Sequence, residues 1–246
     1  MTLRRHAHAS RRRMLRGCLC CGALAVAGGS VLPGATRPAR AADPHARTGL
    51  SPDEALRLLK EGNQNFLTDA PFRGVQGRDR RIEIARGQTP FAVLVSCSDS
   101  RVPPELLFGR GLGELFIYRV AGNTVDRAAL GSIEYAVAEL GVPLVLIMGH
   151  ERCGAVAAAV SVVEKNATFP GAIGEMVEPI VPAVLRARSK GGDLLDEAVR
   201  ENVRGTVTRL RQEGPILSSA IGAGKLRIVG ARYDLDDGAV DFFAET

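Results

Sequence analysis

The chain has 246 residues, 46% of which are hydrophobic, and a formal net charge of +5 with an isoelectric point near 9.2. This length and composition are typical of one soluble domain with a substantial core, and no apolar run reaches the roughly 18 residues of a membrane span. Eight arginines and no acidic residue lie in residues 1–41, so the rest of the chain carries +5 − 8 = −3. The basic character belongs to this leader and does not indicate a nucleic-acid partner.

Residues 1–41 have the features of a bacterial export signal. An arginine-rich start is followed by a modestly apolar stretch over 18–32 and a small-residue cleavage pattern at 39–41. Residues 10–15, Ser-Arg-Arg-Arg-Met-Leu, are similar to a twin-arginine signal, with an ordinary secretory signal as the alternative. We therefore expect a periplasmic or otherwise exported protein that has no stable membrane association after signal removal, with a mature linker at 42–50 and a single domain at 51–246.

Removal of the signal leaves few residues that can bind a metal or form a disulfide. Of five cysteines only Cys97 and Cys153 remain, and of four histidines only His45 and His150 remain. Two cysteines in an oxidising compartment can form a disulfide. Because Asp99 and His150 lie beside them at ligand spacing, the sequence favours a metal site over the disulfide.

Two helices are expected before the first strand. Ser51 serves as N-cap, Pro52 as the first helical residue and Glu54 as the capping-box partner. Polar residues are expected to interrupt this helix, namely Asn63, Asn65 and Asp69. A second, arginine-rich helix is expected over 78–86. Neither helix has a sheet partner in the sequence, so we expect them to pack elsewhere, for example on another subunit.

The rest of the chain alternates between strand and helix patterns. Apolar runs predict strands over 91–96, 114–120, 144–148, 226–233 and 239–243. Helical patterns lie at 104–108, at 126–140, from about 153, and at 174–189 and 193–213. Right-handed crossovers in such a chain give an α/β fold with a mainly parallel central sheet covered by helices on both faces.

Side chains that can bind a metal follow two of these strands. Cys97 and Asp99 come directly after the first buried strand, and His150 and Cys153 follow the third. Open α/β sheets place their sites at the carboxyl ends of the strands. Residues two apart in an extended segment point to the same side, and residues three apart share a face of a helix. Two thiolates, an imidazole and a carboxylate make a four-ligand zinc set.

Arg101 suggests that the carboxylate ligand can leave the metal. A guanidinium can hold Asp99 through two charge-assisted hydrogen bonds. A water could then take the fourth position, where zinc lowers its pKa to about 7, which predicts zinc hydroxide at neutral pH. A non-catalytic zinc-binding protein with a closed site and a dithiol redox protein remain as alternatives.

The motifs Cys97-Ser-Asp99-Ser-Arg101 and His150-x-x-Cys153-Gly154 resemble those of the β-class carbonic anhydrases. The resemblance extends from the first helix to the hairpin at 234–238. It implies one Zn²⁺ per chain, bound by Cys97, His150 and Cys153, and reversible hydration of carbon dioxide through zinc-bound hydroxide. Asp99 would be either a fourth ligand or, when paired with Arg101, the hydrogen-bond partner of the hydroxide. A carbon disulfide or carbonyl sulfide hydrolase on the same scaffold is the alternative.

The resemblance also implies where substrate binds. It assigns substrate contacts to Gln88, Phe116, Ala121, Tyr135 and Gly154. Some relatives carry a larger aliphatic residue in place of Ala121, so the smaller side chain could widen the pocket. The pocket would lie at a dimer interface, with an N-terminal helical arm around the second subunit, in a homodimer or a dimer of dimers. Because the chain has no Trp, a bicarbonate-inhibition pocket built on a Trp is not present in that form.

Overall fold

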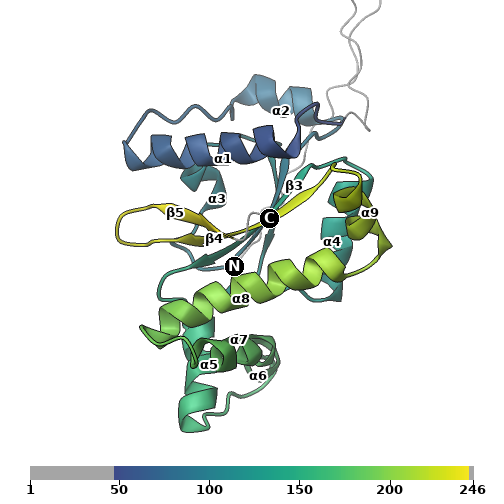
Figure 1. Cartoon of the computed structure of the whole chain (residues 1–246). Helices are drawn as coiled ribbons and strands as arrows, with labels where there is room; N and C mark the ends of the chain where they lie inside the picture. Colours follow the sequence, from purple (N-terminus) through teal and green to yellow (C-terminus); the bar gives the residue numbers. More distant parts are fainter. Residues whose placement is uncertain (1–46, 244–246) are drawn as a thin grey trace, which may run out of the picture. The chain divides into compact units, whose positions relative to one another are not determined.

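The structure, a computed structural model, describes residues 47–243, so the predicted export signal and residues 42–46 of the predicted linker lie outside the described residues. Within them a sheet runs in the order β2-β1-β3-β4-β5 (Figure 1). The strands are β1 (Ala92–Ser96), β2 (Leu115–Arg119), β3 (Leu144–His150), β4 (Arg227–Tyr233) and β5 (Val240–Phe243). Only the β4–β5 pair of this sheet is antiparallel, which confirms the predicted, mainly parallel sheet.

The register of β1 and β3 brings their carboxyl ends together. Both strands are buried along their whole length, as expected for parallel strands covered on both faces. Ser96 pairs with Met148, so Cys97 leaves β1 at the same edge at which His150 ends β3. The predicted convergence of the two strand ends is therefore confirmed.

Helices cover both faces of this sheet (Figure 1). The helices α1 (Pro52–Leu67) and α3 (Pro104–Leu107) contribute to the apolar core on one face. On the opposite face lie α4 (Arg127–Ala138), α8 (Leu194–Gln212) and α9 (Pro215–Gly222). A third apolar cluster joins Cys97 and Cys153 to η1 (Ala121–Asn123), α5 (Gly154–Lys165), α6 (Ala172–Val177), η2 (Glu178–Ile180), α7 (Val181–Ala187) and α8.

The first helix begins as predicted but does not end as predicted. Ser51 and Glu54 form the expected capping box. Asn63 does not interrupt α1, because its side chain faces inward and bonds to the backbone of the β4–β5 hairpin. Its Nδ2 donates to the Gly238 carbonyl at 3.0 Å, and its Oδ1 accepts from the Val240 amide at 2.9 Å. A buried polar side chain satisfied in this way is compatible with a helix interior.

The expectation that both N-terminal helices pack away from the sheet is wrong for α1. Ala55, Leu56 and Leu59 are buried in the same apolar cluster as the strand residues Leu94 and Leu146. This face of the sheet needs a cover, and α3 alone is only one turn long. By contrast, α2 (Arg78–Ile84) buries none of its residues within the chain.

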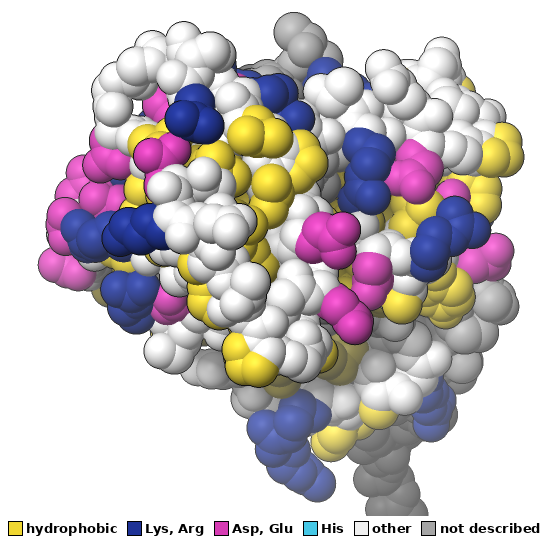
Figure 2. All heavy atoms as spheres, turned by 90° about the horizontal axis from the view of Figure 1, so that it is seen from below, with side chains coloured by type: hydrophobic (Ala, Val, Ile, Leu, Met, Phe, Trp, Pro, Cys, Tyr) yellow, Lys and Arg dark blue, Asp and Glu magenta, His cyan; other side chains and the backbone are white. Residues whose placement is uncertain are grey.

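Further boundaries differ from the prediction. The predicted helix over 174–189 is divided by η2, where Pro179 lacks the amide that a continuous helix needs. Helix α9 was not predicted. None of the helices in the described range is both long and apolar enough to cross a bilayer. On the face shown in Figure 2, hydrophobic side chains lie in small groups between charged ones.

Candidate metal centre

Three ligand atoms meet at the carboxyl edge of the sheet. The sulfurs of Cys97 and Cys153 and a ring nitrogen of His150 all lie within 4.8 Å of one another. The three residues are 4%, 1% and 0% exposed. The two sulfurs are 4.0 Å apart and not joined in a disulfide. Tetrahedral zinc with Zn–S bonds of about 2.3 Å separates two sulfurs by about 3.8 Å, so the observed spacing fits a shared metal ion.

The imidazole of His150 is oriented for metal binding. Its Nδ1 lies 2.9 Å from the Glu151 carbonyl oxygen, which can only accept a hydrogen bond, so Nδ1 carries the proton. The lone pair is therefore on Nε2, which is buried and has no hydrogen-bond partner. An orphaned buried acceptor is costly unless something binds it. Together with two thiols this nitrogen completes a donor set that fits zinc.

The two thiols share their protons unequally. The hydrogen bond with Cys153 is the largest influence on Cys97 and lowers its pKa to about 4, although burial opposes this. The bond to Cys97 and burial together raise the pKa of Cys153. The pair therefore gives up its first proton readily and its second with difficulty. A divalent cation between the sulfurs favours loss of the second proton, so metal binding would release protons.

His150 and Cys153 come together for a different reason from the one predicted. They do not share a helical turn, because His150 is the last residue of β3 and Cys153 is the N-cap of α5. The chain reverses between them at Arg152, which has a φ of +50°. The predicted proximity is confirmed, whereas the helical-face argument for it is wrong.

Asp99 is paired with Arg101. The guanidinium donates from Nε to Oδ1 at 2.9 Å and from Nη2 to Oδ2 at 2.8 Å, and the Arg101 amide also donates to Oδ1. The guanidinium is the largest influence on the carboxyl and holds its pKa well below the usual range. Oδ2 lies 3.9 Å from Nε2 of His150. Of the two arrangements expected for Asp99, the structure has the one paired with arginine.

Two backbone supports of Cys97 were not predicted. Arg119, the last residue of β2, donates from Nε to the Cys97 carbonyl at 2.9 Å and from Nη2 to the Asp99 carbonyl at 2.6 Å. The Gly122 amide lies 3.4 Å from the Cys97 sulfur as a donor. Gly122 has a φ of +74°, and a Cβ there would meet Ile180 at 2.5 Å, so glycine is required. The strand-end argument that found Cys97 could also have found Arg119.

The residues expected to contact substrate do not all reach this centre. Ala121 packs against the cluster that contains both cysteines, and Gly154 is the first residue of α5. Phe116 and Tyr135 lie together with ring centroids 6.4 Å apart, but Phe116 is near the amino end of β2. Gln88 is exposed between α2 and β1. Within the described chain, no contact brings these last three residues to the cysteine pair.

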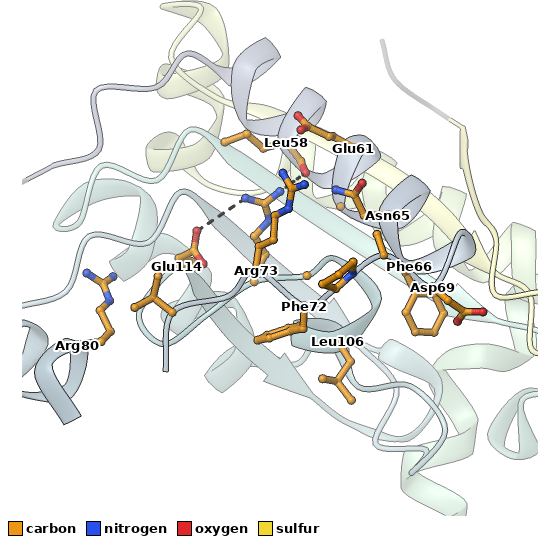
Figure 3. Close-up of a pocket in the computed structure, with 16 residues that line it drawn as sticks. Leu58, Glu61, Asn65, Phe66, Asp69, Phe72, Arg73, Arg80, Leu106 and Glu114 are labelled. Carbon is orange, nitrogen blue, oxygen red and sulfur yellow. Dashed lines mark hydrogen bonds and ion pairs between the residues drawn. The ribbon is translucent and has the colours of Figure 1, made fainter. Parts of the chain in front are cut away.

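A cavity of about 620 Å³ lies elsewhere, between α1, α3 and the segment 69–75 (Figure 3). Arg110 spans it, donating to the Leu58 carbonyl at 2.6 Å and lying 3.8 Å from Glu114. None of the three candidate ligands Cys97, His150 and Cys153 lines this cavity. Cavity size therefore does not identify the metal centre.

Comparison with known proteins agrees with this fold and donor set. The carbonic anhydrase family model matches residues 92–240. Carbonic anhydrase 2 of Mycobacterium tuberculosis is 43% identical over 188 residues, which cover 76% of this chain and 91% of that protein. The carbonic anhydrase of Mycolicibacterium smegmatis is 40% identical over 191 residues, covering 78% and 93%.

Solved structures agree as well. The β-carbonic anhydrase CcaA is 28% identical, with a TM-score of 0.60 over 78% of this chain and 92% of that one. A tetrameric β-carbonic anhydrase of Sordaria macrospora is 26% identical, with a TM-score of 0.60 over 66% and 85%. The chain is therefore an enzyme of the carbonic anhydrase family, whose general reaction is the hydration of carbon dioxide. Within that family it belongs to the β class, which confirms the resemblance seen in its motifs.

Proposed function

We propose that this protein catalyses the reversible hydration of carbon dioxide to bicarbonate and a proton with one Zn²⁺ per chain. Cys97 Sγ, Cys153 Sγ and His150 Nε2 would hold the ion. The observation that carries this proposal is the buried, unpaired Nε2 of His150 beside two free thiols 4.0 Å apart. When bound, zinc lowers the pKa of a coordinated water to about 7 and so supplies a nucleophile at neutral pH.

Asp99 would orient the reacting oxygen. Because Arg101 keeps its carboxyl ionised, Asp99 can accept a hydrogen bond but cannot donate one. A hydroxyl group beside Asp99 must then turn its proton toward the carboxylate and its lone pair toward the substrate. In this proposal Asp99 is a catalytic residue, and Arg101 is a positioning residue that acts through it.

The surroundings of the ligands suit an apolar substrate. Both cysteines lie in the apolar cluster that includes Val156, Val177 and Ile180. Low polarity strengthens the electrostatic interactions within the site and excludes competing water. Ala121 and Gly154 border this cluster, which supports their assignment to the substrate pocket.

We propose that a second subunit brings Gln88, Phe116 and Tyr135 to the site, in a homodimer or a dimer of dimers. Helix α2 buries none of its residues; its Ile82 is 58% exposed, and Val75, which precedes the helix, is 60% exposed. The Sordaria macrospora relatives are described as tetrameric. Sedimentation of the parent protein should therefore give a dimer or larger, and Ile82→Asp should yield monomer with reduced activity.

Residues 1–41 are proposed to direct export by the twin-arginine route, with a linker at 42–50 and one catalytic domain at 51–246. The arginines at 11–13 support this assignment. Cell fractionation should find the mature protein in the periplasm. Replacement of Arg12 and Arg13 by lysine should abolish export to the periplasm. Unchanged export would contradict the twin-arginine route.

Elemental analysis combined with a hydration assay tests the function. We expect one zinc per chain and carbon dioxide hydration that rises with pH, with His150→Ala as the inactive control. Zinc-loaded protein without hydration activity at alkaline pH would indicate a non-catalytic zinc-binding protein. Activity confined to carbon disulfide or carbonyl sulfide would indicate a hydrolase instead.

A further inference from the structure

The two residues between the ligands His150 and Cys153 reach across to the turn of the β4–β5 hairpin. Glu151 donates from its amide to the Tyr233 carbonyl at 2.9 Å, and its Oε2 accepts from the Leu235 amide at 3.2 Å. Arg152 donates to both carboxylate oxygens of Asp236, from Nη1 at 2.9 Å and from Nη2 at 2.7 Å. The segment between the two ligands is thus bonded to the hairpin by backbone and side chains together.

These bonds act on the atoms that orient the ligands. The Glu151 carbonyl accepts the Nδ1 proton of His150 and thereby fixes the tautomer with a free Nε2. Arg152 directly precedes Cys153 and has a φ of +50°, a conformation that costs energy for any residue with a Cβ. The bidentate bond to Asp236 holds Arg152 in that conformation. The backbone direction at Arg152 then determines the position of Cys153, the next residue.

The same carboxylates do not make a second metal site. Oxygens of Glu151, Asp234 and Asp236 lie within 4.8 Å of one another. However, Arg152 contacts both Glu151 and Asp236, and Arg232 contacts Asp234 at 2.9 Å and Glu151 at 3.8 Å. Each of the three acids is already paired with at least one of two guanidinium groups, so this group forms a network of ion pairs.

We propose that Glu151, Arg152 and Asp236 form a hairpin clamp that positions His150 and Cys153 to bind the metal ion. This inference rests on the proposed zinc centre. The three are positioning residues, because they act through the ligands and not on substrate. The Arg152 and Asp236 side chains are 49% and 70% exposed, so their pairing contributes little to global stability. Residues that orient metal ligands nevertheless commonly change metal affinity by about 10- to 100-fold.

Measurements of zinc retention by the full chain distinguish a role in positioning the ligands from a role in folding. The zinc-loaded parent and its variants would be challenged with a chelator, and the rate of zinc loss and the melting temperature of the metal-free form would be measured. We expect Glu151→Gln to lose zinc about 10-fold faster or more, and Arg152→Gly and Asp236→Asn several-fold faster. Glycine tolerates the positive φ, so the metal-free Arg152→Gly protein should melt within a few degrees of the parent.

Asp237→Asn is the matched control. It removes the same charge from the same turn, but its Oδ1 accepts only from the Ala239 amide and does not touch the metal-binding segment. We expect its zinc retention to equal that of the parent. Arg152→Lys should restore part of the retention lost in Arg152→Gly, because lysine keeps the charge but cannot form the bidentate bond. The Arg152→Gly/Asp236→Asn double variant should lose zinc no faster than Arg152→Gly alone, because that substitution already removes the contact with Asp236.

The Co²⁺-substituted protein gives a second readout. The visible spectrum of thiolate-bound cobalt reports ligand geometry, so clamp variants should shift or broaden it while Asp237→Asn should not. Parent-like zinc retention and spectra in Arg152→Gly and Asp236→Asn would overturn the clamp alone. A parent protein that binds no zinc would overturn the metal centre and the clamp with it.

Discussion

The three proposed metal ligands lie in two segments, and these segments are held in different ways. The loop after β1, residues 97–101, is held by near neighbours. Its Asp99 pairs with Arg101, two residues further along. Arg119 of the adjacent strand β2 donates hydrogen bonds to two backbone carbonyls of this loop. The β3 loop, which runs from the last residue of β3 over 150–153, is bonded to a hairpin 84 residues further along the chain.

This difference indicates a division of labour. The Arg101 side chain is more than half exposed, so the Asp99–Arg101 pair can open without disturbing the sheet. His150 is fully buried at the end of a strand, and Cys153 caps a helix. The β1 loop therefore suits a carboxylate that changes partner, whereas the β3 loop suits rigid support of two ligands.

The largest expected effect does not distinguish the loops. Cys97→Ser and Cys153→Ser should each lose zinc, because a serine hydroxyl does not ionise to replace a thiolate. Activity should fall by about 10³-fold or more, since the metal supplies several kcal/mol of transition-state stabilisation. Metal analysis and a hydration assay measure both effects. A variant of either cysteine that keeps zinc and activity would break the assignment of that sulfur as a ligand.

Substitutions in the Asp99–Arg101 pair should distinguish the role of the β1 loop from that of the β3 loop. Asp99→Asn and Arg101→Ala should keep zinc but lose about 100-fold in hydration rate, because a positioned acceptor for the reacting proton is lost. Arg127→Ala, an exposed arginine of α4, serves as the control and should match the parent in both assays. If either variant of the pair lost its zinc, the division between a β1 loop whose carboxylate changes partner and a β3 loop that supports two ligands would not hold.

The same contrast explains what the sequence could predict. Buried apolar runs and nearby ligand types are local patterns, so the parallel sheet, the strand ends and the Asp99–Arg101 pair were all accessible. The bonds of Asn63 to Gly238 and Val240 join residues 175 and 177 positions apart, and nothing in the periodicity of α1 indicates them. Consequently α1 was predicted to be interrupted at Asn63 and to pack away from the sheet.

The role of the segment between His150 and Cys153 was hidden for the same reason. Glu151 and Arg152 resemble ordinary exposed charges until the fold brings the turn at 234–238 beside them. Gln88, Phe116 and Tyr135 came from the family resemblance, and a single chain does not bring them to the cysteine pair. Contacts between segments far apart in the chain therefore could not be read from local sequence patterns.

Gly149→Ala would test how rigidly the β3 strand is supported. A Cβ at Gly149 would meet Val199 at 2.8 Å and Val203 at 2.9 Å on α8. Overpacking of this kind costs about 1–3 kcal/mol, so the metal-free protein should melt several degrees lower. Gly131→Ala in α4 is the control, because a Cβ there meets open space and should add up to about 1 kcal/mol of stability. Equal melting temperatures for both variants would show that α8 yields to the added methyl group.

The smallest expected effect lies beyond the β3 loop, where Glu201 of α8 pairs with Arg186, Lys190 and Arg204. Burial opposes ionisation of Glu201, but the hydrogen bonds from Lys190 and Arg204 outweigh it and lower its pKa below the usual value. Because the pKa is lower in the folded state, the stabilisation is complete above the unfolded pKa of about 4.3 and is lost as pH falls through the folded pKa.

Glu201→Gln should therefore be destabilised by about 1 kcal/mol at pH 7, a small value because the three cations are partly exposed. Thermal unfolding measured between pH 7 and pH 3 should show that the difference in stability between Glu201→Gln and the parent disappears at pH 3. Glu197→Gln, on the same helix, should match the parent throughout. Zinc retention should be unchanged in both, since Glu201 supports the packing of α7 on α8 and not the loop that carries His150 and Cys153. A gap of the same size at pH 3 would assign the loss to packing of the side chain instead of its charge.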